Sequence, residues 1–277
     1  MQGSAELVEA GYTQIHQYMR KIGWDYSEHP NSSSLDHKDG VHGEVIYDLF
    51  IRQYIFKLSI HANEKALDGD RGKLIDRQRN EMKTQTTPSW YKLNGIWDEW
   101  QQLKWKFKIP KDFRPSGSFT HLHQLKAQEG NNGSPVITIT ARSNGNGSNR
   151  RIQIIHNGDT EETTKGTIID NLPLEDFEDE WIQVETEMHY THNGSFSITL
   201  SRLSDGKRLV QRSFDDIDLW RKGAISIRNK FGIYRSFGKT LTDENDRPTN
   251  GIKDEHILLA DFKVYEKNTN PDPQPHD

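Results

Sequence analysis

The stretch Lys230-Phe231-Gly232-Ile233-Tyr234-Arg235-Ser236 continues the run Ala224-Ile225-Ser226-Ile227, and together they predict one long β-strand. Residues two apart on a strand share a face. One face therefore carries Lys230, Gly232 and Tyr234, which suit a core poorly. A glycine within a strand often marks a place where a ligand approaches the backbone. This polar face is either a solvated surface or the floor of a binding site.

Short segments on both sides of this strand also have the composition of β-strands. They alternate apolar and polar residues or are rich in β-branched and aromatic ones, and Gly, Asn, Asp or Pro separates them. So many short strands without alternating helices predict an all-β fold, a β-jelly roll, which is a concanavalin-like two-sheet sandwich with a concave substrate groove. We expect strands at Glu44–Phe50, Tyr54–His61, Arg77–Lys83, Leu103–Ile109, Thr120–Ala127, Val136–Arg142, Arg151–His156, Trp181–His189, Ser195–Arg202, Leu209–Phe214, Ala224–Arg235 and Ile257–Tyr265.

The chain is expected to form a single domain over residues 1–267, followed by a Pro-rich, disordered tail at 268–277. Residues 6–22 have roughly helical spacing and residues 25–43 have the composition of a loop, so we expect the segment 1–43 to pack on the sandwich as helix and loop. A further helical turn is expected near Asp215–Leu219, and Asn144-Gly145-Asn146-Gly147 and Asn193-Gly194 have the chemistry of hairpin turns.

Composition and charge exclude several classes of function. The chain of 277 residues has a net charge of −5 and no cysteine, which excludes disulfides and thiol chemistry. It has no basic run long enough to follow a nucleic acid, so no nucleic-acid partner is expected. It also has no apolar stretch long enough to cross a bilayer, so we expect no membrane partner. We expect a monomer.

Three segments place chemically capable side chains two apart on one strand face. They are Arg79-Asn80-Glu81-Met82, His121-Leu122-His123-Gln124 and the stretch from Lys230 to Tyr234. Taken singly, each has a plain alternative: Arg79 and Glu81 could be a surface ion pair, and the two histidines could be solvated or half of a metal site. If the three strands are neighbours in one sheet, the same side chains line one groove.

The three segments, in this order, resemble the signature strands of the jelly-roll polysaccharide lyases. The alginate-lyase-like families carry an Arg-(Ser/Thr)-Glu-(Leu) strand, a Gln-Ile-His strand and a Tyr-Phe-Lys-(Ala)-Gly-x-Tyr strand. The residue sequence of the third segment is closer to the heparin-lyase-I-like and glucuronan-lyase-like branches. Asn80 replaces the hydroxyl residue and His121 replaces the glutamine.

The resemblance implies a secreted or periplasmic lyase that cleaves a uronic-acid polysaccharide, of the glucuronate type, by β-elimination and leaves an unsaturated product. The start Met1-Gln2-Gly3-Ser4-Ala5 does not have the pattern of a secretion signal, so the signal would have been removed from this chain. The proton on C5 is weakly acidic while the neighbouring carboxylate is charged, so the site must supply cations or donors to that carboxylate.

The resemblance also implies roles for individual residues. Arg79 would hold the carboxylate through its permanently charged fork. His123 would be the base and Tyr234 the acid, or Tyr234 would serve as both. The remaining substrate-binding candidates are His121, Gln124, Lys230, Glu81, Asn80, Arg235 and His42.

Other readings stay open. The same sandwich could be a non-catalytic carbohydrate-binding module, with Trp90, Trp97 and Trp100 stacking on sugars or filling the core. A lectin-like glycoside hydrolase needs two carboxylates across the scissile bond, and no paired Glu-x-Asp-x-x-Glu strand is present. No cofactor is required; structural Ca²⁺ could bind at one of two acidic segments, Asp243, Glu244 and Asp246 or Asp254 and Glu255.

Overall fold

The computed structural model describes residues 19–30, 42–63, 66–67, 70, 76–144, 147–237 and 251–267. The helix expected over residues 6–22 lies outside the described residues except at its end, where residues 19–21 are helical. The acidic loop with Asp243, Glu244 and Asp246, the tail 268–277 and the centre of the turn at 144–147 also lie outside the described residues.

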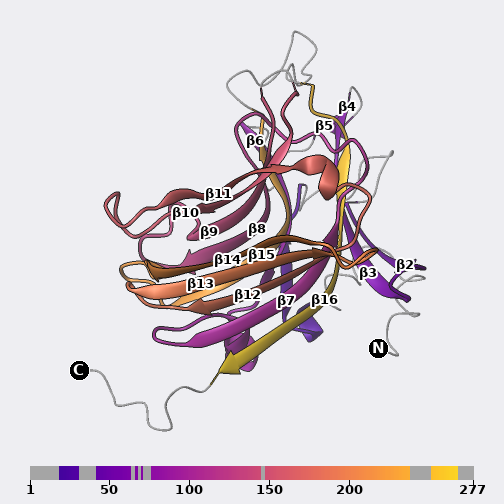
Figure 1. Cartoon of the computed structure of the whole chain (residues 1–277). Helices are drawn as coiled ribbons and strands as arrows, with labels where there is room; N and C mark the ends of the chain where they lie inside the picture. Colours follow the sequence, from indigo (N-terminus) through magenta and orange to yellow (C-terminus); the bar gives the residue numbers. More distant parts are fainter. Residues whose placement is uncertain are drawn as a thin grey trace.

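Two antiparallel sheets of seven strands each stack face to face (Figure 1). The first sheet has the spatial order β1 (Trp24–Glu28), β6 (Arg77–Thr84), β15 (Ser226–Ser236), β8 (Thr120–Gln128), β9 (Ile137–Arg142), β10 (Arg151–His156) and β11 (Gly166–Pro173). The second has the order β14 (Arg208–Ile217), β13 (Gly194–Arg202), β12 (Ile182–His189), β7 (Trp100–Lys108), β16 (Glu255–Lys267), β3 (Gln53–Ile60) and β2 (Gly43–Asp48).

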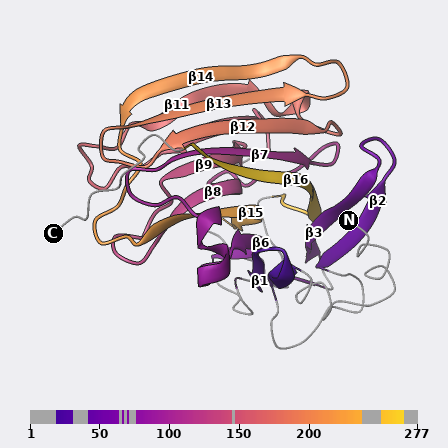
Figure 2. The same ribbon diagram turned by 90° about the horizontal axis from the view of Figure 1, so that it is seen from below.

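The remaining elements are short. β4 (Ala62–Asn63) pairs with β5 (Ala66–Leu67), and single 3-10 turns span Pro88–Leu93 (η2) and Leu174–Asp176 (η3). Figure 2, seen from below, shows β3 and β2 continuing the second sheet beyond β16. The predicted all-β, two-sheet sandwich is confirmed.

The core lies between the two sheets and is built by alternation. Along β7 every second side chain is buried, including Leu103, Trp105 and Phe107, while the lysines between them face solvent. The same period-two pattern runs along β12 and β13. A strand that is solvated on one face needs apolar residues only at alternate positions, which explains how a chain with 32% hydrophobic residues closes a core.

Every strand predicted above is present, with shifts of a few residues at the ends, and Gly194 begins β13 directly after the predicted Asn193-Gly194 turn. Three local predictions were wrong. Residues 24–28, at the start of the expected loop 25–43, form strand β1, and residues 166–173 form the unforeseen strand β11. The helical turn expected near Asp215–Leu219 is instead the end of β14. In each case pairing with a neighbouring strand outweighs weak local preference.

Candidate active site

Strand β15 lies between β6 and β8, so the three segments singled out in the sequence are neighbours in one sheet. Tyr234 is paired in register with Arg79 on one side and His121 on the other. Lys230 is paired with Gln124 in the same way. The inner face of these strands packs in the core, because Met82, Phe231 and Ile233 are completely buried there. Their outer face carries the polar side chains.

A β-bulge in β8 separates the two histidines. Between Phe231 and Tyr234, β15 has two residues where β8 has only Leu122, and the pairing of β8 with β9 shifts at the same place. Gly232 permits this geometry, since its φ is +146° and an added Cβ would lie 2.1 Å from the Asn80 carbonyl oxygen. Bulges redirect side chains in this way. The expectation that His121 and His123 share a face is therefore wrong.

His123 points into the core. Its ring centroid lies 4.7 Å from that of Phe231 and 5.2 Å from that of Trp105, and its Nε2 is 3.1 Å from Asn229 Oδ1. Burial lowers the pKa of His123 to about 4, against the partial compensation of Asn229. This imidazole is neutral near pH 7 and has no access to a substrate on the outer face.

The outer face of β6, β15 and β8 is hollowed into a groove of about 560 Å³. Five of the predicted site residues line it, namely Arg79, His121, Gln124, Lys230 and Tyr234. The complete lining is Glu28, Arg77, Arg79, Lys83, Phe119, His121, Gln124, Lys126, Asn132, Gly133, Ser134, Pro135, Arg228, Lys230 and Tyr234. Six of these residues are lysine or arginine and only Glu28 is acidic, so the groove suits an anionic ligand.

Five predicted site residues do not line the groove: Glu81 lies beneath it, as described below, and four others lie elsewhere, which corrects their expected position. Asn80 points inward and donates to the carbonyl oxygens of His42 and Ser59. Arg235 is completely buried and donates to Gln78 Oε1 and to two carbonyl oxygens. The other two are His123, described above, and His42, which is buried with its Nε2 3.3 Å from His61 Nδ1.

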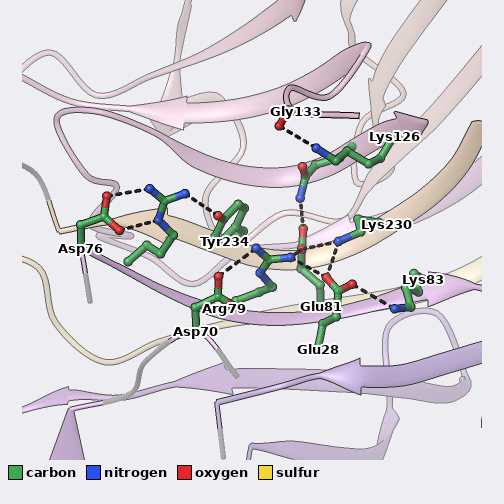
Figure 3. Close-up of polar contacts among 12 residues, drawn as sticks. Glu28, Asp70, Asp76, Arg79, Glu81, Lys83, Lys126, Gly133, Lys230 and Tyr234 are labelled. Atoms are coloured by element: carbon green, nitrogen blue, oxygen red, sulfur yellow. Dashed lines mark hydrogen bonds and ion pairs between the residues drawn. The ribbon is translucent and has the colours of Figure 1, made fainter. Parts of the chain in front are cut away.

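Glu28 on β1 contacts three of the cations that line the groove (Figure 3). It accepts a hydrogen bond from Arg79 at 2.6 Å and one from Lys83 at 3.0 Å, and it forms an ion pair with Lys230. Burial alone would raise the pKa of Glu28, but these three cations outweigh it and hold the pKa well below its usual range. Sequence reasoning missed Glu28 because its segment was assigned to a loop.

Arg79 and Glu81 belong to the same network. Asp70 accepts a second hydrogen bond from Arg79, at 2.9 Å. Glu81 is completely buried, lies 3.8 Å from Arg79 Nη1 and 3.6 Å from Lys230 Nζ, and accepts a hydrogen bond from Gln124. Burial tends to lower the pKa of Arg79, but Glu81 and Glu28 raise it, so the guanidinium is permanently charged. Glu81 therefore orients Arg79, Lys230 and Gln124 from below.

The Tyr234 hydroxyl accepts a hydrogen bond of 2.9 Å from Arg77 Nη1, and Asp76 binds the other side of that guanidinium. The guanidinium of Arg79 lies 3.9 Å from the centre of the Tyr234 ring. Two guanidinium groups therefore contact this phenol, one at its oxygen and one at its ring face. Arg77 was within a predicted strand, but nothing in its local pattern marked it as functional.

His121 completes the polar surface of the groove. Its ring centroid lies 6.0 Å from that of Tyr234, it stacks on Phe119 at 4.7 Å, and its Nδ1 is 2.9 Å from Thr140 Oγ1. Burial, together with the charges of Arg142, Lys126 and Arg79, lowers the pKa of His121 to about 3. The ring is therefore neutral near pH 7, with one nitrogen engaged by Thr140.

The tryptophans considered as sugar platforms lie away from this groove. Trp90 is in η2, Trp97 is 42% exposed and packs edge-on against Trp220, and Trp100 stacks on His189 at 4.7 Å. None of them is among the residues that line the groove.

The second segment considered for Ca²⁺ is engaged within the protein. Asp254 accepts from the Ala62 backbone and Glu255 from the Arg114 backbone. Across the part of the chain that the structure describes, no three His, Cys, Asp or Glu residues gather as for a metal ion. In the same ranges, no helix has the length and apolar character needed to span a membrane.

Comparison with known proteins relates the chain to lyases by its fold. No protein-family model matches the chain, and no curated protein matches its sequence. A product complex of the family 7 alginate lyase A1-II′ superimposes with a TM-score of 0.55 and 12% identity over 88% of this chain and 95% of that one. The alginate lyase from Klebsiella pneumoniae gives 0.55 and 10% over 90% and 96%. The chain thus shares the jelly-roll sandwich of solved alginate lyases along nearly its whole length.

Proposed function

We propose that this protein is a polysaccharide lyase that cleaves a polyuronate by β-elimination. The observation that carries the proposal is the position of Tyr234, whose hydroxyl is held by Arg77 beside neutral His121 in a groove whose charged residues are mainly cations. The shared fold of alginate lyases supports the proposal, because their chains superimpose along most of this one.

The chemistry follows from these side chains. In β-elimination a base removes the proton from C5 and an acid protonates the departing oxygen on C4. Tyr234 can do both in turn: its phenolate accepts the C5 proton and the resulting phenol donates it to the C4 oxygen, while Arg77 donates a hydrogen bond to the same phenolic oxygen. His121, being neutral, provides a ring nitrogen to the substrate without repelling the cations around it. The cationic groove stabilises the negative charge that develops next to the carboxylate.

The environment of Glu28 argues against a glycoside hydrolase. A hydrolase needs one carboxylic acid that keeps its proton until it protonates the leaving group. Among the described residues that line the groove only Glu28 is acidic, and its pKa is lowered, so it holds no proton to donate. Glu81 is completely buried beneath the groove and meets no substrate. A binding module remains the second candidate, since the same cations could hold a polyuronate without cleaving it.

We propose alginate as the first polymer to test, since the superimposed lyases act on it. Glucuronan is the second, since the residues of the Lys230–Tyr234 segment are closer to those of the glucuronan-lyase-like branch. Long polysaccharides are degraded outside the cytoplasm, which agrees with a secreted or periplasmic location.

The first prediction concerns Tyr234. Removing its hydroxyl in Tyr234→Phe takes away the proton carrier but little else, so the rate of elimination should fall by about 100-fold or more. The measurement is the ultraviolet absorbance of the unsaturated product, with alginate and glucuronan as substrates.

Tyr265→Phe is the matched control, because Tyr265 lies on β16 of the second sheet and is 47% exposed. It should retain full activity, and both variants should unfold at the temperature of the wild type. Full activity in Tyr234→Phe would rule out the proposed mechanism. A wild type that binds these polymers but releases no unsaturated product would favour the binding module.

A further inference from the structure

Arg79, the expected ligand of the uronate carboxylate, is already paired with carboxylates of the protein itself. Arg79, Lys83 and Lys230 are matched by the carboxylates of Glu28, Asp70, Glu81 and Asp25, all within 4 Å of at least one of them. Both terminal nitrogens of the Arg79 guanidinium are already bonded to carboxylates. A substrate carboxylate at Arg79 would have to compete with ion pairs that are already formed and largely buried.

Arg142, on β9, is an arginine on the same face with no such partner. Ile139 and Ala141 of β9 are buried in the core, so Thr140 and Arg142 face outward with the groove. Thr140 is the residue that contacts His121. No hydrogen bond or ion pair joins the Arg142 side chain to any residue that the structure describes, and its Nε is buried without a partner.

Arg151, on β10, lies directly opposite Arg142 in the antiparallel register. Like charges in directly opposed positions destabilise a sheet. Arg151 donates a hydrogen bond to the Asn149 carbonyl oxygen at 3.1 Å and lies 3.5 Å from Asp170, and its Nε is also buried and unsatisfied by any hydrogen bond. Burial and the charge of Arg151 lower the pKa of Arg142, against the opposite effect of Asp170. An anion bound beside both arginines would offset their mutual repulsion.

We propose that Arg142 and Arg151 form a carboxylate-binding subsite that holds a uronate of the polymer next to the one over Tyr234 and His121. The inference rests on the proposed polyuronate substrate and goes beyond it, because it assigns recognition to β9 and β10 rather than to Arg79.

The geometry is consistent with a neighbouring sugar. Adjacent strands lie about 4.8 Å apart, so β9 and β10 lie roughly 10 Å and 14 Å from β15 across the sheet, in the order β15-β8-β9-β10. In register, Tyr234 lies opposite His121, His121 opposite Thr140, and Thr140 opposite Gln153. Arg142 and Arg151 stand two residues further along their strands, about 7 Å from that line, so a polymer that crosses the sheet obliquely from Tyr234 passes over both. Two guanidinium groups from directly opposed positions provide the planar, charged donors that carboxylates prefer. Gln153, beside Arg151 on the same face, is occupied by Asp170, so the arginines carry the recognition.

The experiment measures binding and turnover of alginate and glucuronan by Arg142→Gln, Arg142→Lys and Arg151→Gln. Loss of a charge-assisted hydrogen bond weakens binding by about 10- to 100-fold, so KM should rise by that factor in Arg142→Gln while kcat changes by less than about three-fold. Arg142→Lys should recover part of the loss, because it keeps the charge but not the fork. Binding of carboxyl-reduced polymer, which lacks the anion and cannot undergo the elimination, should not differ between these variants and wild type.

Lys104→Gln is the matched control, since it removes one positive charge from the outer face of the second sheet, where Lys104 lies 3.3 Å from Glu185. Unchanged KM in Arg142→Gln, equal to that of Lys104→Gln, would overturn the subsite and leave the lyase proposal intact.

Binding is also measured in the Tyr234→Phe background, where cleavage cannot interfere. If the wild type makes no unsaturated product but Arg142→Gln still weakens polyuronate binding, the lyase proposal fails and the subsite stands. If the wild type neither cleaves nor binds either polymer, both proposals fail.

Discussion

His123 shows how the surroundings of a single residue decide its chemistry. The resemblance of its segment to a Gln-Ile-His strand made it the expected general base. The bulge at Leu122 turns it into the core against Trp105 and Phe231. His121 takes the position beside Tyr234. The base expected at His123 must therefore come from Tyr234 or from His121 in the groove.

The variant His123→Gln tests this reassignment. It should keep elimination activity within several-fold of wild type at about pH 7.5, because residue 123 does not reach the substrate. The amide can still bond to Asn229. Loss of activity as complete as that of Tyr234→Phe, in a folded variant, would return the catalytic role to His123.

The same variant should change the pH dependence of stability. Burial lowers the pKa of His123 from its ordinary 6.5 to about 4 in the folded chain. Between these two values the unfolded chain binds a proton that the folded one does not, so stability falls as pH falls, by at most about 1.4 kcal/mol per pH unit. His123→Gln removes this contribution. Urea unfolding at about pH 7.5 and about pH 5 should show a smaller loss for the variant than for wild type.

At the scale of elements, strand β1 organises the site from the edge of the first sheet. Its pairing with β6 places Glu28 opposite Glu81, and the bulge between Asp25 and Glu28 sets the direction of the side chain. From there Glu28 reaches Arg79, Lys83 and Lys230. A short edge strand thus fixes side chains from β6 and β15 that are far from it in sequence.

Removing the charge in Glu28→Gln should destabilise the protein by about 3–5 kcal/mol, because it leaves buried cations without their shared partner. Activity should fall as well, since Lys230 and Arg79 lose their fixed positions. The measurement is urea unfolding together with the rate of elimination. Glu44→Gln is the comparison: its pair with Lys57 is about one-third exposed on both sides and should cost about 0–1 kcal/mol. Equal effects of the two changes would show that Glu28 is not the centre of the network.

At the scale of the whole molecule, the charge distribution is uneven. The chain has a net charge of −5, yet the groove has six basic residues and one acidic residue in its lining. Three cations have no ion pair with any described residue. They are Lys126 and Arg228 within the groove and Arg142 beside it. Burial and neighbouring cations lower the pKa of Lys126 to about 8. The anionic body thus presents one positive surface to a polyanion.

This arrangement predicts a marked salt dependence. Raising NaCl from about 50 mM to about 500 mM shortens the range of these charges to less than half, so kcat/KM on a polyuronate should fall by about ten-fold or more. The fall should come mainly from KM. Initial rates at several polymer concentrations measure it, with the melting temperature followed in the same buffers. A kcat/KM that does not change with salt would mean that the cationic face does not attract the substrate.

The sequence by itself determined most of the strands, the sandwich and the three polar segments of the site, but not β1 or β11. These depend on alternation within a strand and on glycine or asparagine at turns, which are interactions between near neighbours in the chain. Lys230 and Tyr234, four residues apart on β15, face the groove as their spacing predicts.

Only the tertiary structure decided which face His123 occupies, which carboxylates neutralise Arg79, and that Arg142 has no ion pair with any described residue. Each depends on register between strands distant in the chain: β8 with β15, β1 with β6, and β9 with β10. A one-residue bulge reverses the face of every later residue on a strand. The alternation of residues within one strand does not reveal such a shift. The chemistry of the groove is therefore set by the register in which the strands pair.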